Sequence, residues 1–573
     1  MMKLLKYLSK NKLALIISIV CALISVTMSL LAPIIIGKAI DGMASEGNVD
    51  FQSIIKILIL LAVVYILGSA FMWGLTYITS EISYKVANSI RKDLLEKINK
   101  LPLKFFDNNS HGDIISRFVN DVDAITDGMI QGVASLLTGI ITILGAIGFM
   151  FYINSVMAVI VLLSAPFTYF VARFITKNSQ KYFKSQADRV GELNGYVEEM
   201  ISGQKTVKAF SHEEDSVNNF KKINSELYKV GIKAQFFGAL ANPSTRLVNN
   251  LAYAIVGVSG SIIAILGNIS IGDISSFLIY SNLFSKPFNE ITGVLTQIQG
   301  AFASADRIFE ILEIEEEKDE GPSKEIENIK GDIQFKNIQF SYTPDKKLIT
   351  DFNLKVKAGS KVAIVGKTGC GKTTLVNLIM RFYNSDSGSI YIDGIDTKDM
   401  KRDNLRKNFG MVLQETFLFT DTIANNISYG KKDTTIEEII HASKKTGAHS
   451  FIRRLPNGYN TVISAEGQNL SVGQKQLLTI TRVMLVDPPM LILDEATSNI
   501  DTRTELKIQK AFEIIMKDRT SFIIAHRLST IMDADVILVM DNGNVAEQGN
   551  HVELLNKDGI YRALWNSSKE NCC

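Results

Sequence analysis

A glycine-rich stretch in the second half of the 573-residue chain has the spacing of a phosphate-binding loop. Residues 366–373 read GKTGCGKT, after an apolar segment that predicts a β-strand, Val362–Val365, and before a predicted helix, Thr374–Arg381. Glycines let backbone N–H groups wrap around phosphate oxygens, the helix N-terminus adds a favourable potential, and Lys372 reaches the β- and γ-phosphates. We expect a nucleotide to be bound by Gly366, Lys367, Thr368, Gly369, Cys370, Gly371, Lys372, Thr373 and Thr374.

A second stretch supplies two carboxylates. Met490–Leu493 is apolar, as expected of a buried strand, and Asp494 and Glu495 follow at its carboxyl end. Oxygen ligands suit Mg²⁺, so Asp494 and the Thr373 hydroxyl are expected to hold the metal. Transfer of a phosphoryl group to water needs a residue that positions the water or accepts its proton, and Glu495 is the candidate.

These motifs lie in a region that has the pattern of an α/β domain. Apolar segments bounded by turns, such as Asp332–Phe340 and Lys361–Val365, predict strands, and helical segments alternate with strands thereafter. An acidic run and Gly321-Pro322 precede the region and predict a solvated linker. The predicted organisation is a domain over residues 1–312, a linker over 313–330 and a P-loop ATPase domain over 331–573.

The first part of the chain is apolar enough to lie in a membrane. A membrane-spanning helix needs roughly 20 mostly apolar residues, and several segments of that length carry no formal charge: Leu13–Gly37, Ile57–Ser80, Gly128–Ala172 and Leu247–Gly272. Gly128–Ala172 fits two helices with a turn near Asn154-Ser155, and a sixth span starts at Ile274. The predicted fold class is a polytopic α-helical membrane domain of six long helices, followed by the α/β P-loop ATPase domain.

Basic residues at the start of the chain predict its orientation. Lys3, Lys6, Lys10 and Lys12 precede the first span and place the N-terminus in the cytoplasm. An even number of crossings returns the chain to that side, so the ATPase domain is expected to be cytoplasmic as well. A signal peptide is disfavoured because the first apolar segment is too long and no cleavage site stands out.

Two charges interrupt the sixth span, and two interpretations of them remain open. Lys286 and Glu290 are four residues apart and therefore share one helix face. They could line a pathway for cargo, or they could satisfy each other near the membrane boundary.

Overall charge and cysteine content exclude other classes of protein. The net charge is +2, from 61 basic and 59 acidic residues, which argues against a nucleic-acid partner. The four cysteines, Cys21, Cys370, Cys572 and Cys573, are too scattered for a disulfide framework or a zinc site. The terminal pair could be a lipidation site or part of a disordered tail.

With these motifs in place, the chain resembles the ATP-binding-cassette (ABC) transporters. Residues 470–474 (LSVGQ) resemble the family's signature motif, with Ser471, Gly473 and Gln474 as its nucleotide-binding residues. The resemblance implies further roles for residues at matching positions. Gln414 matches the Q-loop residue, which serves catalysis and Mg²⁺, and His526 matches the switch histidine. Asp501 matches the D-loop aspartate, and Tyr342 matches the aromatic that stacks on adenine.

The resemblance extends over the membrane half. Residues 101–107 with 112–117, and residues 203–214, look like the two coupling loops of ABC exporters. The order of domains resembles an exporter half-transporter, which implies a dimer in a membrane, in this case the bacterial plasma membrane. Each ATP, with Mg²⁺, would lie between one chain's phosphate loop and its partner's signature motif. The implied function is ATP-driven export of hydrophobic or amphipathic compounds, either drugs or lipids, by alternating access.

Three residues depart from the family pattern. Val472 replaces a glycine of the signature, Ala465 stands where many exporters carry glutamate, and Asn499 replaces the alanine of the D-loop. Valine resists the backbone angles and the close approach that glycine allows. This pattern resembles one subunit of the heterodimeric bacterial exporters and favours a heterodimer with a second ABC half-transporter over a homodimer. An ATP-gated channel or a regulatory membrane ATPase is the alternative function.

Overall fold

The computed structural model describes residues 2–43, 50–267, 269–318, 328–343, 345–414, 416–464, 467, 469–494, 501–524 and 531–570. The chain divides into two compact units. The helical unit comprises Met1–Asn99 and Ser110–Ile314, and the sheet unit comprises Lys100–Asn109 and Glu315–Cys573. The first stretch that resembles a coupling loop is therefore divided between the units, because residues 100–109 group with the sheet unit.

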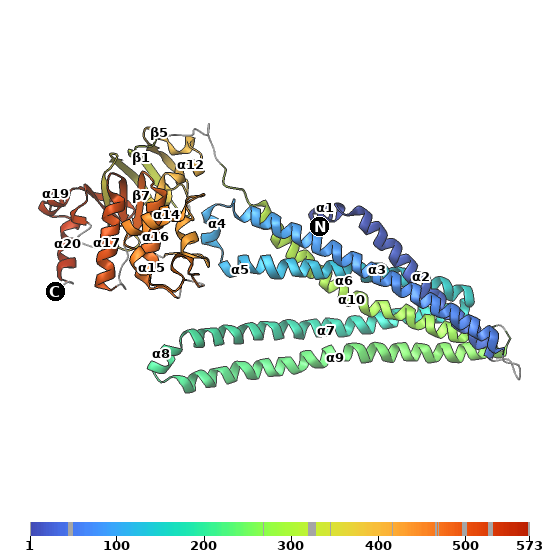
Figure 1. The fold of residues 1–573 in the computed structure, drawn as a ribbon. Coiled ribbons are helices and arrows are strands. Elements are labelled where there is room, and N and C mark those ends of the chain that lie inside the picture. Colours follow the sequence, from blue (N-terminus) through green and yellow to red (C-terminus); the bar gives the residue numbers. More distant parts are fainter. Residues whose placement is uncertain are drawn as a thin grey trace. The chain divides into compact units, whose positions relative to one another are not determined.

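Six long helices build the helical unit (Figure 1): α2 (Lys12–Met43), α3 (Phe51–Ile98), α6 (Val122–Ile153), α7 (Ser155–Ser202), α9 (Glu213–Ile265) and α10 (Ile271–Glu313). Shorter helices accompany them: α1 (Met2–Ser9), α5 (His111–Ser116), the π-helix η1 (Arg117–Asp121) and α8 (Gln204–Ala209). The predicted turn near Asn154 is confirmed, since the Asn154 side chain caps α7 by accepting the N–H groups of Val156 and Met157.

Apolar length identifies the membrane spans. Among the described residues, four helical runs are long and apolar enough to cross a membrane: Lys12–Met43, Phe51–Ile98, His111–Ile153 and Arg246–Ile265. The other two predicted spans fall in α7 and α10. Helices suit this setting because their backbone hydrogen bonds are made within the segment. The prediction of a polytopic helical membrane domain is confirmed.

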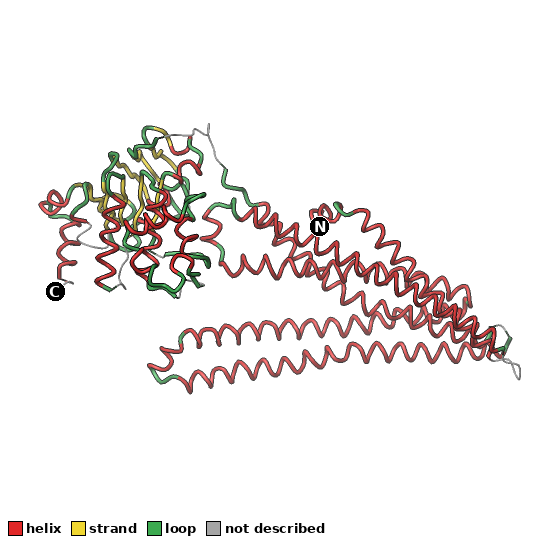
Figure 2. The backbone as a smooth tube through the Cα atoms, viewed as in Figure 1, coloured by secondary structure: helices red, strands yellow, loops and turns green. Residues whose placement is uncertain are grey.

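Within the helical unit, the long helices pack in pairs. α7 lies along α9 and is joined to it by α8 and a short turn, while α6 lies along α10 and α2 along α3 (Figure 2). A buried cluster that includes Leu30, Met150, Phe277 and Tyr280 joins α2, α6 and α10.

The sheet unit contains two sheets. The six-stranded sheet has the order β10-β9-β3-β8-β7-β6, in which the strands from β9 to β6 pair in parallel. The four-stranded sheet is antiparallel, with the order β2-β1-β4-β5. The strands are β1 (Ile333–Phe340), β2 (Ile349–Val356), β3 (Lys361–Val365), β4 (Ser387–Ile392), β5 (Ile395–Asp396), β6 (Phe409–Val412), β7 (Met490–Asp494), β8 (Thr520–Ile524), β9 (Val536–Asp541) and β10 (Asn544–Gly549).

Alternating residues of the parallel strands fill two separate cores. Val362 and Ile364 of β3 face the core shared with the antiparallel sheet, whereas Ala363 and Val365 face the core covered by helices such as α16 and α17. The helices and turns of this unit are α4 (Leu103–Asn108), α11 (Lys372–Ile379), η2 (Thr397–Asp399), α12 (Arg402–Lys407), α13 (Ile423–Ser428), α14 (Ile436–Lys445), α15 (His449–Ile452), η3 (Gly458–Asn460), α16 (Val472–Val486), α17 (Thr502–Met516), α19 (His551–Asn556) and α20 (Ile560–Glu570). Cys572 and Cys573 lie outside the described residues.

A candidate nucleotide-binding site

The predicted phosphate loop joins β3 to α11. Gly366, Gly369 and Gly371 have φ values of 154°, 82° and 102°, a region that disfavours residues with a side chain. A Cβ at Gly366 would lie 2.4 Å from the backbone oxygen of Met540. The loop therefore requires glycine both for its backbone angles and for its close packing, and Gly371 leads directly into the first turn of α11.

A cleft of about 330 Å³ lies over this loop. The Lys372 ammonium lies on the loop, where it donates hydrogen bonds to the carbonyl oxygens of Gly366 (2.8 Å) and Lys367 (3.0 Å). The predicted residues that line the cleft are Tyr342, Thr368, Gly369, Gly371, Lys372, Thr373, Thr374, Gln414 and Asp494. Cys370 is buried and forms no disulfide among the described residues.

The register of the parallel strands explains why distant residues meet here. Val412 of β6 pairs with Leu493 of β7, and Asp494 pairs with Ile524 of β8. Since β8 also pairs with β3, the carboxyl ends of these strands share one edge of the sheet. Ligands bind at this edge in open α/β sheets. Gln414 and Asp494 are thereby placed beside a phosphate loop that lies far from both in the sequence.

Tyr342 is fixed at the cleft by hydrogen bonds that the sequence did not reveal. Its hydroxyl donates to the Thr374 hydroxyl (3.2 Å) and accepts from the Asn377 side-chain amide (3.2 Å). Its ring meets those of Phe340 and Tyr383 edge to face. Asn377 lies one helical turn after Thr374, so helical spacing along α11 was the signal that could have identified it. Leu348 also lines the cleft and was not predicted.

The signature residues form the N-terminus of another helix, α16. The Ser471 hydroxyl accepts the N–H of Gln474, and the Gln474 side chain accepts the N–H of Ser471, which makes a capping box. Ser471 and Val472 are exposed, and Gly473 is buried. In the described part of the chain, these residues do not line the cleft over the phosphate loop. They present a separate helix N-terminus, a type of surface that favours anions.

Val472 has a regular helical backbone. This residue is the first of α16 and is not among the described residues with positive φ. Its backbone therefore does not require glycine, and the expectation of backbone strain is wrong. Val472 still adds bulk at the start of α16, where it is 53% exposed.

Asp501 caps α17 and accepts the backbone N–H of Thr504 at 2.9 Å. The Thr504 N–H, followed by the Thr504 hydroxyl, lowers the pKa of the Asp501 carboxyl and keeps it ionised. Four predicted residues, Glu495, His526, Ala465 and Asn499, lie outside the described residues. Glu495 directly follows β7, and His526 follows β8 by two residues.

Taken together, the fold and the cleft define a P-loop nucleotide-binding domain fused to a polytopic membrane domain. Two family models match the chain: the ABC transporter transmembrane region over residues 15–288, and ABC transporter over residues 349–498. The chain belongs to the ABC transporter family.

Relatives in this family match nearly the whole chain. It is 41% identical over 514 residues to a fatty acid ABC transporter ATP-binding/permease protein of Mycobacterium bovis. This alignment covers 90% of this chain and 81% of the relative. It is 35% identical over 550 residues to an ATP-dependent lipid A-core flippase of Syntrophus aciditrophicus. This alignment covers 96% of this chain and 91% of the relative. The structure of a bacterial Atm1-family ABC exporter with ATP bound matches with a TM-score of 0.79 at 27% identity, over 97% of this chain and 98% of that chain.

These findings establish the class of activity. The protein is an integral membrane exporter whose ATP-binding domain hydrolyses ATP to drive transport. Exporters of this type work as dimers. A channel or a purely regulatory ATPase is not favoured.

Proposed function

We propose that the protein exports or flips amphipathic lipids across the bacterial plasma membrane, with its N-terminus and sheet unit in the cytoplasm. The observation that carries the ATPase part is the cleft in which the phosphate loop, Gln414 and Asp494 converge at one sheet edge. The relatives named for fatty acid and lipid A transport support a lipid cargo. The basic residues of α1 and the start of α2 support the orientation.

Each residue assigned to the site has a task in ATP hydrolysis. The backbone N–H groups of the phosphate loop and the Lys372 ammonium bind the β- and γ-phosphates, and Tyr342 stacks on adenine. Glu495 positions the attacking water and accepts its proton, while His526 contacts the γ-phosphate. The γ-phosphoryl group then passes to water, and ADP, as the leaving group, stays bound to the loop through its phosphate oxygens.

The donor set in the cleft fits Mg²⁺. Thr373, Asp494 and Gln414 bring hydroxyl, carboxylate and amide oxygens to one cleft, which is the chemistry that this metal prefers. When bound, Mg²⁺ would neutralise charge on the β- and γ-phosphates. These three residues would hold it, with Asp494 supplying the negative charge.

A second subunit would complete the ATP site. Ser471, Gly473 and Gln474 lie away from this chain's own cleft, at an exposed helix N-terminus that would face the ATP held by the partner. Val472 adds bulk at that surface, so the partner's ATP would be bound less closely. This asymmetry supports a heterodimer with a second ABC half-transporter whose own signature motif carries glycine.

Hydrolysis by the purified dimer in lipid tests the assignment of the site. Glu495→Gln should retain ATP binding and nearly abolish turnover, because an amide cannot accept the proton. Lys372→Ala should fail earlier, with ATP binding itself lost. Lys432→Ala is a control, because this exposed lysine does not line the cleft. Unchanged hydrolysis by Glu495→Gln would show that another residue is the base.

A further inference from the structure

A second tyrosine lies directly behind Tyr342 in the sheet unit. Tyr342 lines the nucleotide cleft, whereas Tyr383 is not among the described residues of its lining. The rings of the two tyrosines pack edge to face with centroids 5.0 Å apart, and the Phe340 ring packs on both, 4.9 Å from Tyr342 and 5.7 Å from Tyr383. Aromatic rings in such contact favour a defined mutual geometry, so the position of Tyr383 depends on that of Tyr342.

Asn377 of α11 holds both tyrosines in one frame. Its side-chain amide donates to the Tyr342 hydroxyl at 3.2 Å, and its backbone carbonyl accepts the N–H of Tyr383 at 3.4 Å. The turn that carries Tyr383 is held by the buried Arg381, which donates to the carbonyl of Thr397 at 2.9 Å. Since the backbone is fixed on both sides, a change at Tyr342 reaches Tyr383 through the contact between the rings.

The hydroxyl of Tyr383 connects this aromatic cluster to the first predicted coupling loop. It donates a hydrogen bond to the carboxylate of Asp107 in α4. Burial raises the pKa of the Tyr383 hydroxyl, and so does this hydrogen bond, so the hydroxyl stays protonated and donates. α4 has six residues, none of them buried, and its N-cap Pro102 makes no capping hydrogen bond. A helix this short is not stable alone, so α4 depends on contacts such as Tyr383–Asp107.

We infer that Tyr383 is a positioning residue that makes the attachment of α4 depend on the base of the bound nucleotide. Adenine stacked on Tyr342 restricts that ring, the ring supports Tyr383, and Tyr383 holds Asp107. The coupling acts in both directions, so a firmly attached α4 also favours the stacked base. This inference rests on the adenine role of Tyr342 in the proposed function. It adds a signal that comes from the base and does not need the γ-phosphate.

Hydrogen exchange on the full-length dimer in nanodiscs, with Mg²⁺, tests this inference. The ligands are ADP, which lacks the γ-phosphate, and pyrophosphate, which carries two phosphates without the base. We expect ADP to slow exchange of the α4 amides about fivefold, which is at the lower end for coupled sites. Pyrophosphate should protect only the phosphate loop.

Tyr383→Phe keeps the ring and removes the hydroxyl that reaches α4. In this variant ADP should still protect the phosphate loop but no longer α4. Because coupling is reciprocal, its dissociation constant for ADP should rise by no more than about fivefold. Tyr459→Phe is the matched control, since the Tyr459 hydroxyl also forms a hydrogen bond, at 2.9 Å to His449, but does not line the cleft. This control should behave as the unchanged protein does.

Asp107→Ala removes the other partner of the same hydrogen bond. It should abolish the effect of ADP on α4 as Tyr383→Phe does, and the double variant should lose nothing further. Equal protection of α4 by ADP and pyrophosphate, or protection by ADP that persists in Tyr383→Phe, would overturn the inference. The test needs neither hydrolysis nor cargo. Protection of the phosphate loop reports on the proposed nucleotide site, whereas protection of α4 reports on Tyr383, so the two failures can be told apart.

Discussion

Arg307 on α10 forms a bidentate ion pair with Asp121, the last residue of the π-helix η1. One of its hydrogen bonds, from Nε to Oδ2, measures 3.0 Å. The Asp121 side chain is only 8% exposed, and Arg307 also donates to the Ser304 hydroxyl at 3.0 Å. The pair therefore fastens α10 to the segment that leads into α6, across 186 positions of sequence.

Removal of Arg307 should destabilise the helical unit. Arg307→Ala leaves a largely buried carboxylate without its charged partner, which costs about 2 kcal/mol. The thermal unfolding midpoint of the purified protein in detergent should fall by several degrees. Lys85→Ala is the control, because the exposed pair Lys85–Glu81 is worth about 0.3–0.5 kcal/mol. Equal midpoints for the two variants would contradict a stabilising role for the Arg307–Asp121 pair.

Loss of the Tyr342 ring should weaken ATP binding more than loss of its hydroxyl. Tyr342→Phe keeps the aromatic face and removes the bonds to Thr374 and Asn377, so we expect a dissociation constant raised about threefold, or ~0.6 kcal/mol. Tyr342→Ala should raise it at least 10-fold, because stacking is lost as well. Titration with a fluorescent ATP analogue measures both constants. An alanine variant that binds as tightly as the unchanged protein would exclude Tyr342 from the adenine site.

The coupling loops should pass motion between ATP hydrolysis and transport. The rings of Phe105 and Phe106 in α4 pack edge to face, with their centroids 5.4 Å apart. Within the sheet unit, the Asp107 carboxylate accepts a hydrogen bond from the Tyr383 hydroxyl. Phe106→Ser should lower the cargo moved per ATP hydrolysed by proteoliposomes, while hydrolysis continues. Phe210→Ser in the second loop, where the ring is 72% exposed, should act in the same direction. Normal transport by Phe106→Ser would remove the main support for the first loop.

Local patterns in the sequence were sufficient to predict the main elements of both units. Asn154 interrupts a charge-free segment and has the side chain to cap a helix, so the turn between α6 and α7 was predictable. The strands β1 and β3 were predicted within one residue, because their buried residues are apolar and turns bound them. The spacing of the glycines was sufficient to predict the phosphate loop. Glycine is required there because the backbone has positive φ values, which other residues rarely adopt.

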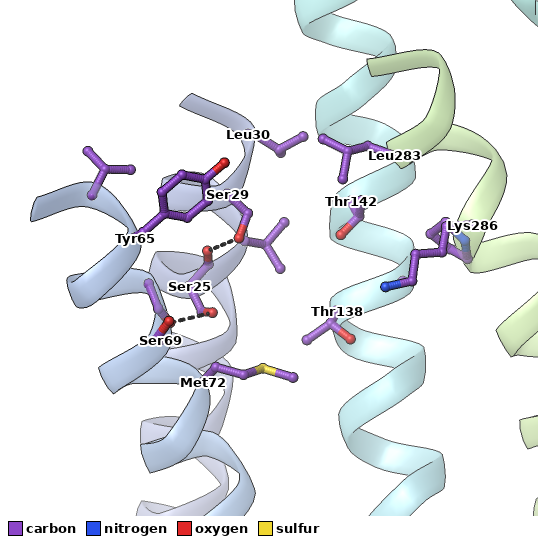
Figure 3. Close-up of a pocket in the computed structure, with 15 residues that line it drawn as sticks. Ser25, Ser29, Leu30, Tyr65, Ser69, Met72, Thr138, Thr142, Leu283 and Lys286 are labelled. Carbon is purple, nitrogen blue, oxygen red and sulfur yellow. Dashed lines mark hydrogen bonds between the residues drawn. The ribbon is translucent and has the colours of Figure 1, made fainter. Parts of the chain in front are cut away.

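Contacts between distant segments could not be predicted from local patterns. Nothing around Arg307 indicates that Asp121 is its partner. The helix face on which Lys286 lies could be predicted from its spacing to Glu290. The pocket that Lys286 lines together with hydroxyl-bearing residues of α2, α3 and α6 (Figure 3) could not be predicted. The backbone of Val472 was misjudged because the capping box places the residue inside a regular helix. For Glu495 and His526, which lie outside the described residues, the motif and the positions after β7 and β8 remain the basis of their assignment.

The bulk of Val472 predicts how the chain behaves without its partner. In a heterodimer, Val472→Gly should raise turnover at the ATP site of the partner, because glycine permits a closer approach to the γ-phosphate. In a homodimer without this defect, the substitution should have no effect. For the chain expressed alone, light scattering measures whether it forms a dimer, and ATPase assays measure whether Val472→Gly changes turnover. A stable dimer of this chain with two equivalent hydrolytic sites, unaltered by Val472→Gly, would establish the homodimer.

Transport in proteoliposomes shows whether ATP hydrolysis drives lipid movement. The dimer is reconstituted with its sheet units outward, and entry of a fluorescent fatty acid is followed against its gradient after addition of Mg²⁺ and ATP. We expect uphill accumulation by the unchanged protein and none with Glu495→Gln or with ADP. Uphill accumulation that Glu495→Gln sustains at the same rate, or movement that only dissipates the gradient, would contradict this expectation.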